Sequence, residues 1–303
     1  MNNNEIFNKL RSILEDNEIL RNEPMKLHTS FKIGGPADFF IAPKNIEKLV
    51  STIKLCSNEK IPYYIMGNGS NLLVSDKGFR GVILQIYKNF NEVRIVDDRV
   101  YAQAGVLLSR LSKDIYEASL EGFEFASGIP GTLGGAVFMN AGAYGGEMKH
   151  IVEEVTVVTH QGDFINLPKE ALALDYRSSI LQKEDYVAIS ATLKLKKGEK
   201  ELIKRTLDEL NHKRKTKQPL EMPSAGSTFK RPEGYFAGKL IMDAGLRGHC
   251  IGGAQVSEKH CGFVVNKGSA TAEDVILLME HVREVVKEMF GVELEPEVKL
   301  LGE

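Results

Sequence analysis

Cysteine is scarce in this chain, which has three among its 303 residues: Cys56, Cys250 and Cys261. An odd number of widely spaced cysteines does not make a disulfide framework and is typical of a chain in a reducing cytosol. Two of them follow a histidine, as His249-Cys250 and His260-Cys261, but this spacing matches no familiar zinc pattern. The sequence therefore predicts scattered structural cysteines and no metal site.

Long apolar runs are also missing. No segment approaches the roughly 20 apolar residues that cross a bilayer, and residues 1–20 lack the apolar core of a signal peptide. Lys and Arg together number 39 against 41 Asp and Glu, and the formal charge of -2 argues against a general nucleic-acid or membrane binder. We therefore expect a cytoplasmic globular chain with no nucleic-acid partner, no membrane insertion and no obligate protein partner.

Hydrophobic periodicity predicts an α+β chain of mixed order, without regular βαβ alternation. Residues 1–22 have the pattern of one amphipathic helix, which Pro24 ends. Thr271 and Asp274 are typical of a capping box, and they predict a long helix that Gly291 ends. Further helices are expected over residues 46–53, 107–115 and 198–219, and strands over 38–42, 62–67, 81–86, 153–159, 164–167, 187–195 and 292–301.

Glycine is abundant, with 28 residues, and it is concentrated at 34–36, 67–71, 128–135 and 142–146. Glycine permits positive φ angles and lets backbone N–H groups approach a ligand closely, which is how loops hold phosphates. A Rossmann loop is disfavoured because Leu72 stands where a third glycine is required, and no P-loop motif is present. An ordinary turn is enough to explain any one of these glycine clusters. Four clusters beside asparagines, however, favour a cofactor-binding cleft that is lined by backbone groups.

Six sequence segments occur in a fixed order along the chain, and together they are specific for one family of proteins. They are HTSFKIGGPAD (28–38), GNGSNLLVSD (67–76), SGIPGTLGGAVFMNAGAYGGE (127–147), YRSS (176–179), PSAGSTFKRP (223–232) and LEPEVK (294–299). With them the chain resembles the UDP-N-acetylenolpyruvoylglucosamine reductases over nearly its whole length. The resemblance implies an α+β fold: an N-terminal helix (1–23), then a two-lobed FAD-binding domain of the vanillyl-alcohol-oxidase type (24–195). A C-terminal α+β substrate-binding lobe (196–303) would follow, and its terminal strand would return to the active site.

The resemblance also implies FAD bound without a covalent link, and NADPH as co-substrate. His28 is the nearest candidate for the covalent attachment found in some proteins of this fold, but this family lacks that bond. The residues carried over as FAD-binding are Thr29, Ile33, Gly34, Gly67, Asn68, Gly69, Ser70, Asn71, Gly128, Pro130, Gly131, Gly134, Gly135, Asn140 and Gly142. NADPH rests on the resemblance alone, because no residue in the sequence distinguishes it from NADH.

Three residues match the family's catalytic positions. Ser227, in AGSTF, would donate a proton to the substrate, although without the motif a serine in a glycine-containing turn would be the better interpretation. Arg177, after Tyr176, would stabilise an enolate with its permanently charged fork of N–H donors. Glu297 would share a proton or fix the geometry of Arg177, and the family pattern selects it over the nearby Glu295.

Four further residues are expected to contact the substrate: Tyr144, Tyr176, Arg214 and Lys217. The alternative for the basic run 212–217 is a solvated helix end, where Lys and Arg are common, and the alternative for Tyr144 is the core. The interval from Arg177 to Lys213 is too short for the tyrosine-bearing loop of one branch of the family. The chain is therefore similar to the other branch.

Two other functions stay open at this point. One is another oxidoreductase or oxidase of the same flavin fold that acts on a sugar or alcohol, against which AGSTFKRP and LEPEVK argue. The other is a nucleotide-sugar-binding protein without activity, against which the intact Arg177, Ser227 and Glu297 argue. The expected reaction is the NADPH-dependent reduction of UDP-N-acetylglucosamine enolpyruvate to UDP-N-acetylmuramate through FAD, in peptidoglycan precursor synthesis.

Overall fold

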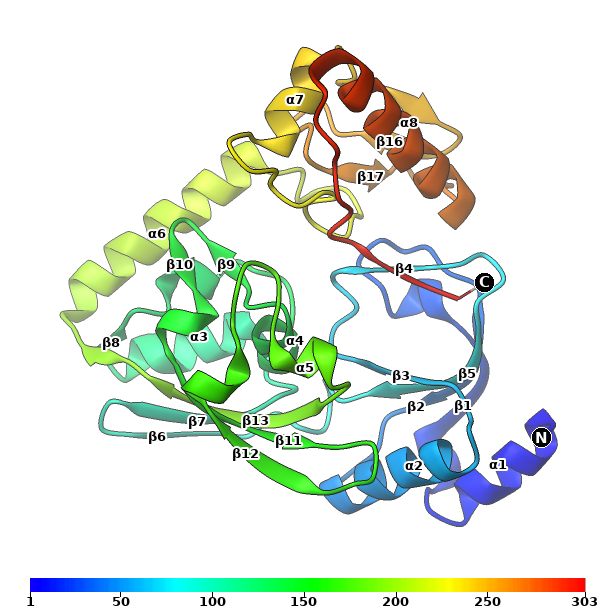
Figure 1. The fold of residues 1–303 in the computed structure, drawn as a ribbon. Coiled ribbons are helices and arrows are strands. Elements are labelled where there is room, and N and C mark those ends of the chain that lie inside the picture. The colour runs from blue at the N-terminus through cyan, green and yellow to red at the C-terminus, as the bar shows by residue number, and fades with distance from the viewer. Residues whose placement is uncertain (303) are drawn as a thin grey trace. The chain divides into compact units, whose positions relative to one another are not determined.

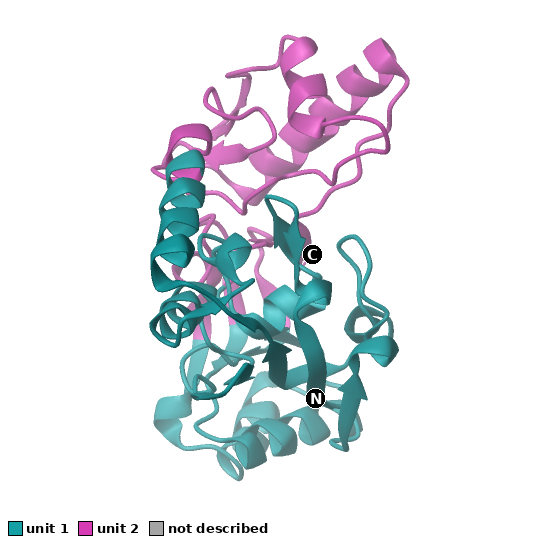
Figure 2. Cartoon of the chain, turned by 90° about the vertical axis from the view of Figure 1, so that its left-hand side faces the viewer, with its two compact units in different colours: residues 1–21, 38–68, 81–213 teal, residues 22–37, 69–80, 214–303 magenta. Residues whose placement is uncertain are grey.

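The computed structural model describes residues 1–302 and forms two compact units, which Figure 2 distinguishes by colour. Unit 1 comprises Met1–Arg21, Asp38–Asn68 and Gly81–Lys213, and unit 2 comprises Asn22–Ala37, Gly69–Arg80 and Arg214–Glu303. Unit 2 therefore combines two N-terminal segments with the C-terminal part of the chain. The sequence instead predicts a grouping of residues 24–195 around the cofactor, and that functional division stays a prediction.

One sheet, most of it in unit 1, has four strands in the order β1-β2-β5-β3 (Figure 1). Its strands are β1 (Ile19–Pro24), β2 (Pro36–Ile41), β5 (Phe79–Gln85) and β3 (Tyr63–Met66). Helix α2 (Ile46–Asn58) begins where the Asn45 side chain accepts a hydrogen bond from the Lys48 backbone, and Leu49 and Ile53 lie on its buried face. Helix α2 and strands β2, β3 and β5 confirm the helix and the three strands that the sequence predicts in this region.

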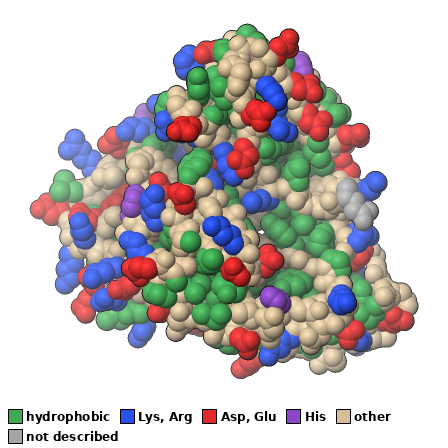
Figure 3. Space-filling view, viewed as in Figure 1, with side chains coloured by type: hydrophobic (Ala, Val, Ile, Leu, Met, Phe, Trp, Pro, Cys, Tyr) green, Lys and Arg blue, Asp and Glu red, His purple; other side chains and the backbone are tan. Residues whose placement is uncertain are grey.

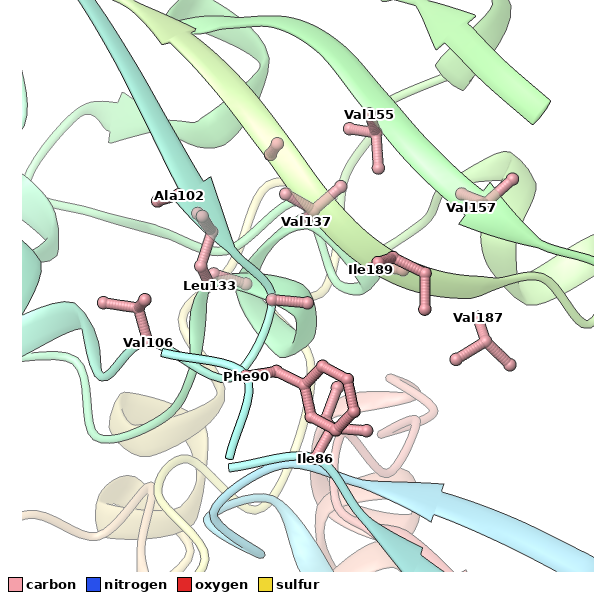
Figure 4. Close-up of a cluster of buried hydrophobic side chains, with 14 of the residues drawn as sticks. Ile86, Phe90, Ala102, Val106, Leu133, Val137, Val155, Val157, Val187 and Ile189 are labelled. Atoms are coloured by element: carbon pink, nitrogen blue, oxygen red, sulfur yellow. The ribbon is translucent and has the colours of Figure 1, made fainter. Parts of the chain in front are cut away.

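The second sheet of unit 1 has five antiparallel strands in the order β12-β11-β13-β7-β6. They are β12 (Phe164–Pro168), β11 (Val152–Val158), β13 (Val187–Lys194), β7 (Arg99–Gln103) and β6 (Val93–Val96). Figure 4 shows Leu133 and Val137 of the short helix α4 (Leu133–Phe138) in one buried cluster with Ala102 and Ile189 of the sheet. This packing fixes the position of α4 and of the glycine-rich segment that leads into it.

Unit 2 contains a three-stranded antiparallel sheet and the long helix α8 (Ala272–Phe290). Its other elements are α7 (Ala237–Asp243), β15 (Cys250–Ile251), β16 (Ala254–Val256), β17 (Val264–Asn266), β4 (Leu72–Val74) and β18 (Lys299–Leu301). The predicted capping box of Thr271 and Asp274 is present, and Gly291 ends α8 with a φ of 67°. Strand β18 pairs in parallel with β4, so the C-terminal strand lies directly beside the segment that follows the loop at 67–71.

The remaining elements are short, apart from one long helix. They are α1 (Asn3–Arg11), α3 (Leu108–Glu117), β8 (Leu120–Glu121), β9 (Gly142–Ala143), β10 (Gly146–Glu147), α5 (Ile180–Lys183), β14 (Lys196–Lys197) and α6 (Lys200–Lys217). Five 3₁₀ turns are η1 (Asp16–Glu18), η2 (Met25–Leu27), η3 (Glu124–Ala126), η4 (Met148–His150) and η5 (Lys169–Leu172). Helices α3 and α6 confirm the two helices expected over residues 107–115 and 198–219.

Two expectations about the ends of the chain are wrong. Residues 1–22 do not form one helix, because α1 ends at Arg11 and the chain continues into β1. A place beside β2 in the sheet outweighs the helical pattern there. The terminal strand is also shorter than expected, since only β18 is a strand and Pro296 forms one isolated bridge with Phe229. Proline lacks the N–H that a continuous ladder requires.

Within residues 1–302, no helix is both long and apolar enough to cross a membrane. The face shown in Figure 3 carries Lys and Arg interspersed with Asp and Glu, in keeping with the nearly equal numbers of the two charges. Some of these side chains form ion pairs, such as Arg99 with Glu153 at 2.7 Å, which keeps the pKa of Glu153 below its usual value.

Glu18 is a buried acid of unit 1, with 3% of its surface exposed. Its carboxylate accepts hydrogen bonds from Lys48 Nζ at 2.6 Å and from the Lys44 backbone N–H at 2.8 Å. Burial by itself raises the pKa of Glu18, but the bonds from Lys48 and from two backbone N–H groups outweigh it and keep the pKa below its usual value. Folding therefore favours the charged form of this carboxylate.

We expect Glu18→Gln to lower the free energy of unfolding at pH 7 by about 2 kcal/mol, because Lys48 loses a charged partner. The Glu18 contribution is present above the pKa of an unfolded glutamate, about 4.3, and is lost as the pH falls through the lower folded-state pKa. Urea unfolding at neutral and at strongly acidic pH measures it, with the exposed Glu47→Gln on α2 as control. A difference that persists unchanged at acidic pH would show that the charge is not its source.

Candidate active site

Ser227 lies in a loop of unit 2 whose backbone is anchored. Gly226 before it has a φ of 79°. The Thr228 N–H after it donates to the Gly262 carbonyl at 2.8 Å, and Thr228 Oγ1 accepts from the Val264 N–H at 2.9 Å. Thr228 is buried, whereas Ser227 is exposed. The loop therefore presents the Ser227 hydroxyl at the surface on a fixed backbone.

Backbone hydrogen bonds bring Glu297 next to this loop. Its N–H donates to the Thr228 carbonyl at 2.8 Å, and its carbonyl accepts from Asn71 Nδ2 at 3.1 Å. The Lys299 N–H in turn donates to the Asn71 carbonyl at 3.0 Å. Three segments that are far apart in the sequence therefore meet within unit 2. Asn71, predicted to bind the cofactor, joins the glycine loop at 67–71 (the first glycine loop) to the segment of Glu297. The backbone of Glu297 in turn joins that segment to the loop of Ser227.

Glu295 and Glu297 have different surroundings. Glu295 is exposed and forms an ion pair with Lys230, and the Lys230 N–H also donates to the Glu295 carbonyl at 2.8 Å. Glu297 is half-buried. Glu295 is therefore the more exposed of the two and is paired at the surface, and the choice of Glu297 as a catalytic residue stays a prediction.

The segment that carries Thr29, Ile33 and Gly34 packs within unit 2. Thr29 Oγ1 donates to the Ile33 carbonyl at 3.0 Å, and both residues are buried. Gly34 has a φ of 136°, and a Cβ there would overlap a side chain of β4. The Ser30 N–H donates to the Gly69 carbonyl at 3.1 Å, so this segment and the first glycine loop lie together. Contact of these residues with FAD stays a prediction.

Arg177 lies in a tight turn of unit 1, between Asp175 and Ser178, whose backbone groups exchange two hydrogen bonds of 3.1 Å. Arg177 has a φ of 52°, a left-handed conformation that a residue other than glycine rarely adopts. Such a conformation costs free energy and is maintained by the structure around it, often at functional sites. The Arg177 guanidinium lies 5.0 Å from the centre of the Tyr176 ring, within cation–π range.

Two of the glycine clusters meet in unit 1. A Cβ on Gly67 would lie 2.3 Å from Thr132 Oγ1, and a Cβ on Gly134 would lie 2.8 Å from Ala104 Cβ. Thr132 also caps α4, because its hydroxyl accepts from the Gly135 N–H at 3.4 Å. These glycines are required because the Thr132 side chain occupies the space that a Cβ on Gly67 would take, and Ala104 occupies that space at Gly134.

The remaining predicted residues differ in exposure. Arg214 is buried, whereas Lys217 and Tyr144 are exposed, so Tyr144 is not a core residue. Tyr144 has a φ of 53° and lies in the turn that joins β9 to β10. The predicted residues of unit 1 are Gly67, Asn68, Gly128, Pro130, Gly131, Gly134, Gly135, Asn140, Gly142, Tyr144, Tyr176 and Arg177. Those of unit 2 are Thr29, Ile33, Gly34, Gly69, Ser70, Asn71, Arg214, Lys217, Ser227 and Glu297.

The three cysteines are free thiols. Burial raises the pKa of the Cys56 thiol to about 12, so this group is protonated at neutral pH. Cys261 is buried as well, and Cys250 is exposed and donates to the Gly248 carbonyl at 3.3 Å. The residues that the structure describes contain no group of three or more His, Cys, Asp or Glu side chains arranged to hold a metal ion.

Two family models match the chain. An FAD binding domain matches residues 37–168, which include both glycine loops that meet at Gly67 and Thr132. At the level of fold, a solved alkyldihydroxyacetonephosphate synthase aligns with a TM-score of 0.50 and 16% identity over 64% of this chain and 40% of that one. The chain is thus a flavoprotein-type α+β protein with the FAD-binding fold of the vanillyl-alcohol-oxidase type.

The second family model and full-length relatives narrow this class. The UDP-N-acetylenolpyruvoylglucosamine reductase C-terminal domain matches residues 218–301, which contain Ser227 and Glu297. The UDP-N-acetylenolpyruvoylglucosamine reductase of Lachnoclostridium phytofermentans is 55% identical, with 99% of this chain and 98% of the relative covered. That of Clostridioides difficile is 54% identical over 100% of both chains. The crystal structure of the Thermus caldophilus reductase has a TM-score of 0.80 at 36% identity, covering 94% of this chain and 98% of that one. The chain belongs to the UDP-N-acetylenolpyruvoylglucosamine reductase family.

We expect Gly67→Ala to destabilise the protein by about 1–3 kcal/mol, because the new Cβ would overlap Thr132 Oγ1 and an overpacked contact costs about that much. Thr132→Ala removes this oxygen together with the N-cap of α4, so the comparison is a double-mutant cycle: Gly67→Ala should cost less in the Thr132→Ala background than in the parent. Chemical unfolding measures both effects. Gly135→Ala is the control, since a Cβ there meets its nearest neighbour at an ordinary 3.6 Å. If Gly135→Ala destabilised the chain as much as Gly67→Ala, the close approach would not be the cause.

Proposed function

We propose that this chain reduces UDP-N-acetylglucosamine enolpyruvate to UDP-N-acetylmuramate with NADPH, a step that supplies peptidoglycan precursors. The observation that carries the proposal is the meeting of the Ser227 loop, the Glu297 segment and Asn71 within unit 2, in a chain of the reductase family. A reaction that consumes a nucleotide sugar and NADPH is expected in the cytoplasm. No obligate protein partner is required for it.

The residues present fit an FAD molecule bound without a covalent link. Gly67 lies against the Thr132 side chain, so two glycine-containing segments are neighbours in unit 1, and the backbone N–H groups of such segments hold diphosphates. Gly67, Asn68, Gly131 and Gly135 would hold the cofactor from unit 1. When bound, FAD would supply the redox chemistry, taking a hydride from NADPH and passing it to the terminal carbon of the enolpyruvyl group.

Ser227 would supply the proton that completes the reduction. Hydride addition leaves negative charge on the neighbouring carbon, conjugated with the substrate carboxylate, and this carbon must be protonated. A hydroxyl is a weak acid, which suits a strongly basic carbon held within hydrogen-bond reach. Ser227 is exposed on an anchored loop, so its hydroxyl is available to a substrate.

Arg177 and Glu297 would act on the negative charge that develops on the substrate. The planar fork of Arg177 suits a carboxylate that gathers negative charge, and Tyr176 lies against the guanidinium. A carboxylate at Glu297 would repel the enolate unless it carries a proton or is paired, so we assign it the sharing of a proton or the orientation of Arg177. Tyr144 and Lys217 are exposed and could contact the substrate, as proposed from the resemblance.

An anaerobic absorbance titration tests the function. Flavin bands should bleach when NADPH is added to the purified protein and return when UDP-N-acetylglucosamine enolpyruvate is added. Bands that bleach but do not respond to this substrate would retain the flavin fold and transfer the assignment to an oxidase or another oxidoreductase acting on a sugar or alcohol. A protein that takes up no FAD on incubation would overturn the interpretation of the glycine loops.

A further inference from the structure

Two amide side chains hold the carbonyl groups of the turn that carries Arg177. Gln182 Nε2 donates to the Arg177 carbonyl at 3.1 Å and to the Phe138 carbonyl at 2.7 Å. Asn140 Nδ2 donates to the Asp175 carbonyl at 3.0 Å. A primary amide has two N–H groups, so these bonds commit both donors of Gln182. The turn is therefore tied at both ends to the segment 138–140.

The segment 138–140 begins at the last residue of α4, so the turn of Arg177 is attached to the end of a helix. Phe138 is the last residue of α4, and carbonyls at a helix C-terminus have no partner within the helix. Ser179 Oγ, which is fully buried, donates to the same Phe138 carbonyl at 2.7 Å. Figure 1 shows α4 and α5 side by side, in agreement with their contacts. Because Thr132, in the glycine loop at 128–135 (the second glycine loop), is the N-cap of α4, one short helix joins this loop to the turn of Arg177.

Asn140 is fully buried, and its side-chain amide is also bonded within the chain. Its Nδ2 also donates to Glu147 Oε2 at 2.9 Å, and its Oδ1 accepts from the Lys149 N–H at 2.9 Å. Both N–H groups of this amide are thus used within the chain. These bonds give Asn140 a part in shaping the turn, and its contact with FAD stays a prediction.

We propose that Gln182 is a positioning residue for Arg177. The left-handed φ of 52° at Arg177 is unfavourable for an arginine, so the turn needs an outside contact to maintain it. Among the hydrogen bonds described above, the one from Gln182 reaches Arg177 itself, through its carbonyl. Gln182 would thereby hold the guanidinium in place relative to α4 and the second glycine loop. The proposal rests on the proposed function, because it takes Arg177 as the group that stabilises the enolate.

The test uses Gln182→Met in the full-length flavin-loaded protein, since methionine has a similar length and no N–H donor. We expect reoxidation of the reduced flavin by the enolpyruvyl substrate to slow about 10- to 100-fold, as expected for a misplaced reacting group. The effect should fall on kcat more than on KM, and bleaching by NADPH should stay nearly unchanged. Gln182→Glu also lacks the amide donors, and it provides the same comparison if Gln182→Met does not fold.

Two controls separate positioning from general support. Ser179→Ala removes a bond to the same Phe138 carbonyl and none to Arg177, so it should leave the substrate half-reaction nearly unchanged. Gln161→Met makes the identical change at an exposed turn of unit 1 and should have no effect. If Ser179→Ala slowed the reaction as much as Gln182→Met, or if Gln182→Met slowed both half-reactions equally, the positioning role would be overturned.

Arg177→Lys separates this proposal from the proposed function. If Gln182 acts through Arg177, the double variant Arg177→Lys with Gln182→Met should be no slower than Arg177→Lys alone. Losses that multiply in the double variant would show that Gln182 acts elsewhere, and the positioning proposal alone would fail. If Arg177→Lys left the substrate half-reaction intact, the assigned role of Arg177 would fail, whatever the result for Gln182.

Discussion

Replacing Ser227 by alanine is expected to slow transfer of hydride from the reduced flavin to the enolpyruvyl substrate by about 10²- to 10⁴-fold, the range that a positioned general acid contributes. Bleaching of the flavin by NADPH should be nearly unchanged, because that half-reaction needs no proton at the substrate carbon. Stopped-flow absorbance under anaerobic conditions measures the two half-reactions separately. The contrast between them is the signature of a proton donor, since a general loss of folding or flavin would slow both.

The Ser227→Ala substitution should leave the backbone of its loop unchanged. Its neighbour Thr228 holds the loop through the Gly262 carbonyl and the Val264 N–H, so the loop backbone does not depend on the Ser227 hydroxyl. The matched control is Ser224→Ala in the same loop, where the contact to Ser30 is made by the Ser224 carbonyl and survives the change. If Ser224→Ala slowed the substrate half-reaction to the same extent, or if Ser227→Ala slowed both half-reactions equally, Ser227 would not be the donor.

Elements with a strong local signal could be predicted from the sequence. Helix α8 is an example, because the side chains of Thr271 and Asp274 each accept a hydrogen bond from the other's backbone N–H and Gly291 supplies the left-handed residue that ends the helix. These interactions span four residues or fewer at each end, so they are readable without the fold. Strand β1 is the opposite case. Its residues continue the apolar pattern of α1, and only the neighbouring β2 makes a strand of them.

The part of unit 2 between residues 233 and 270 was not predicted. Strands β15 to β17 have two or three residues each, too few to show an alternating pattern. Glycines with positive φ, such as Gly248 and Gly252, interrupt the segment, so it has the composition of a loop. Helix α7, with seven residues, was missed for the same reason of length.

The sequence yields candidate site residues, which stay predictions, but it does not yield their arrangement. The bond from Asn71 to the Glu297 carbonyl joins residues 226 positions apart, and no local pattern encodes such a contact. Thr132 could have been found, because a threonine before a run of small and apolar residues is an N-cap signal. Gln182 carries no signal of this kind, since its importance follows from Phe138 and Arg177 lying within reach of one amide.

Replacing Glu297 by glutamine is the second large effect that we expect, a loss of about 10²- to 10⁴-fold in the substrate half-reaction if it shares a proton there. Glutamine has the size of glutamate, and the bonds that hold this position use the Glu297 backbone with Thr228 and Asn71. The loss would therefore report on the charge or the proton of the carboxylate. Glu295→Gln is the matched control and should be nearly as fast as the parent, because Glu295 only pairs with Lys230 at the surface.

The pH dependence of the Glu297→Gln rate distinguishes the two roles left open for this carboxylate. If Glu297 shares a proton with the reacting substrate, the variant should lose one limb of the pH–rate profile, because the titrating group is gone. If Glu297 only orients Arg177, the rate should fall by the same factor at every pH and the profile should keep its shape. An equal loss in Glu295→Gln would argue against both roles, since the side chain two residues away would then be equivalent. The comparison works because the backbone bonds on either side of Pro296, from the Lys230 N–H to the Glu295 carbonyl and from the Glu297 N–H to the Thr228 carbonyl, use neither carboxylate.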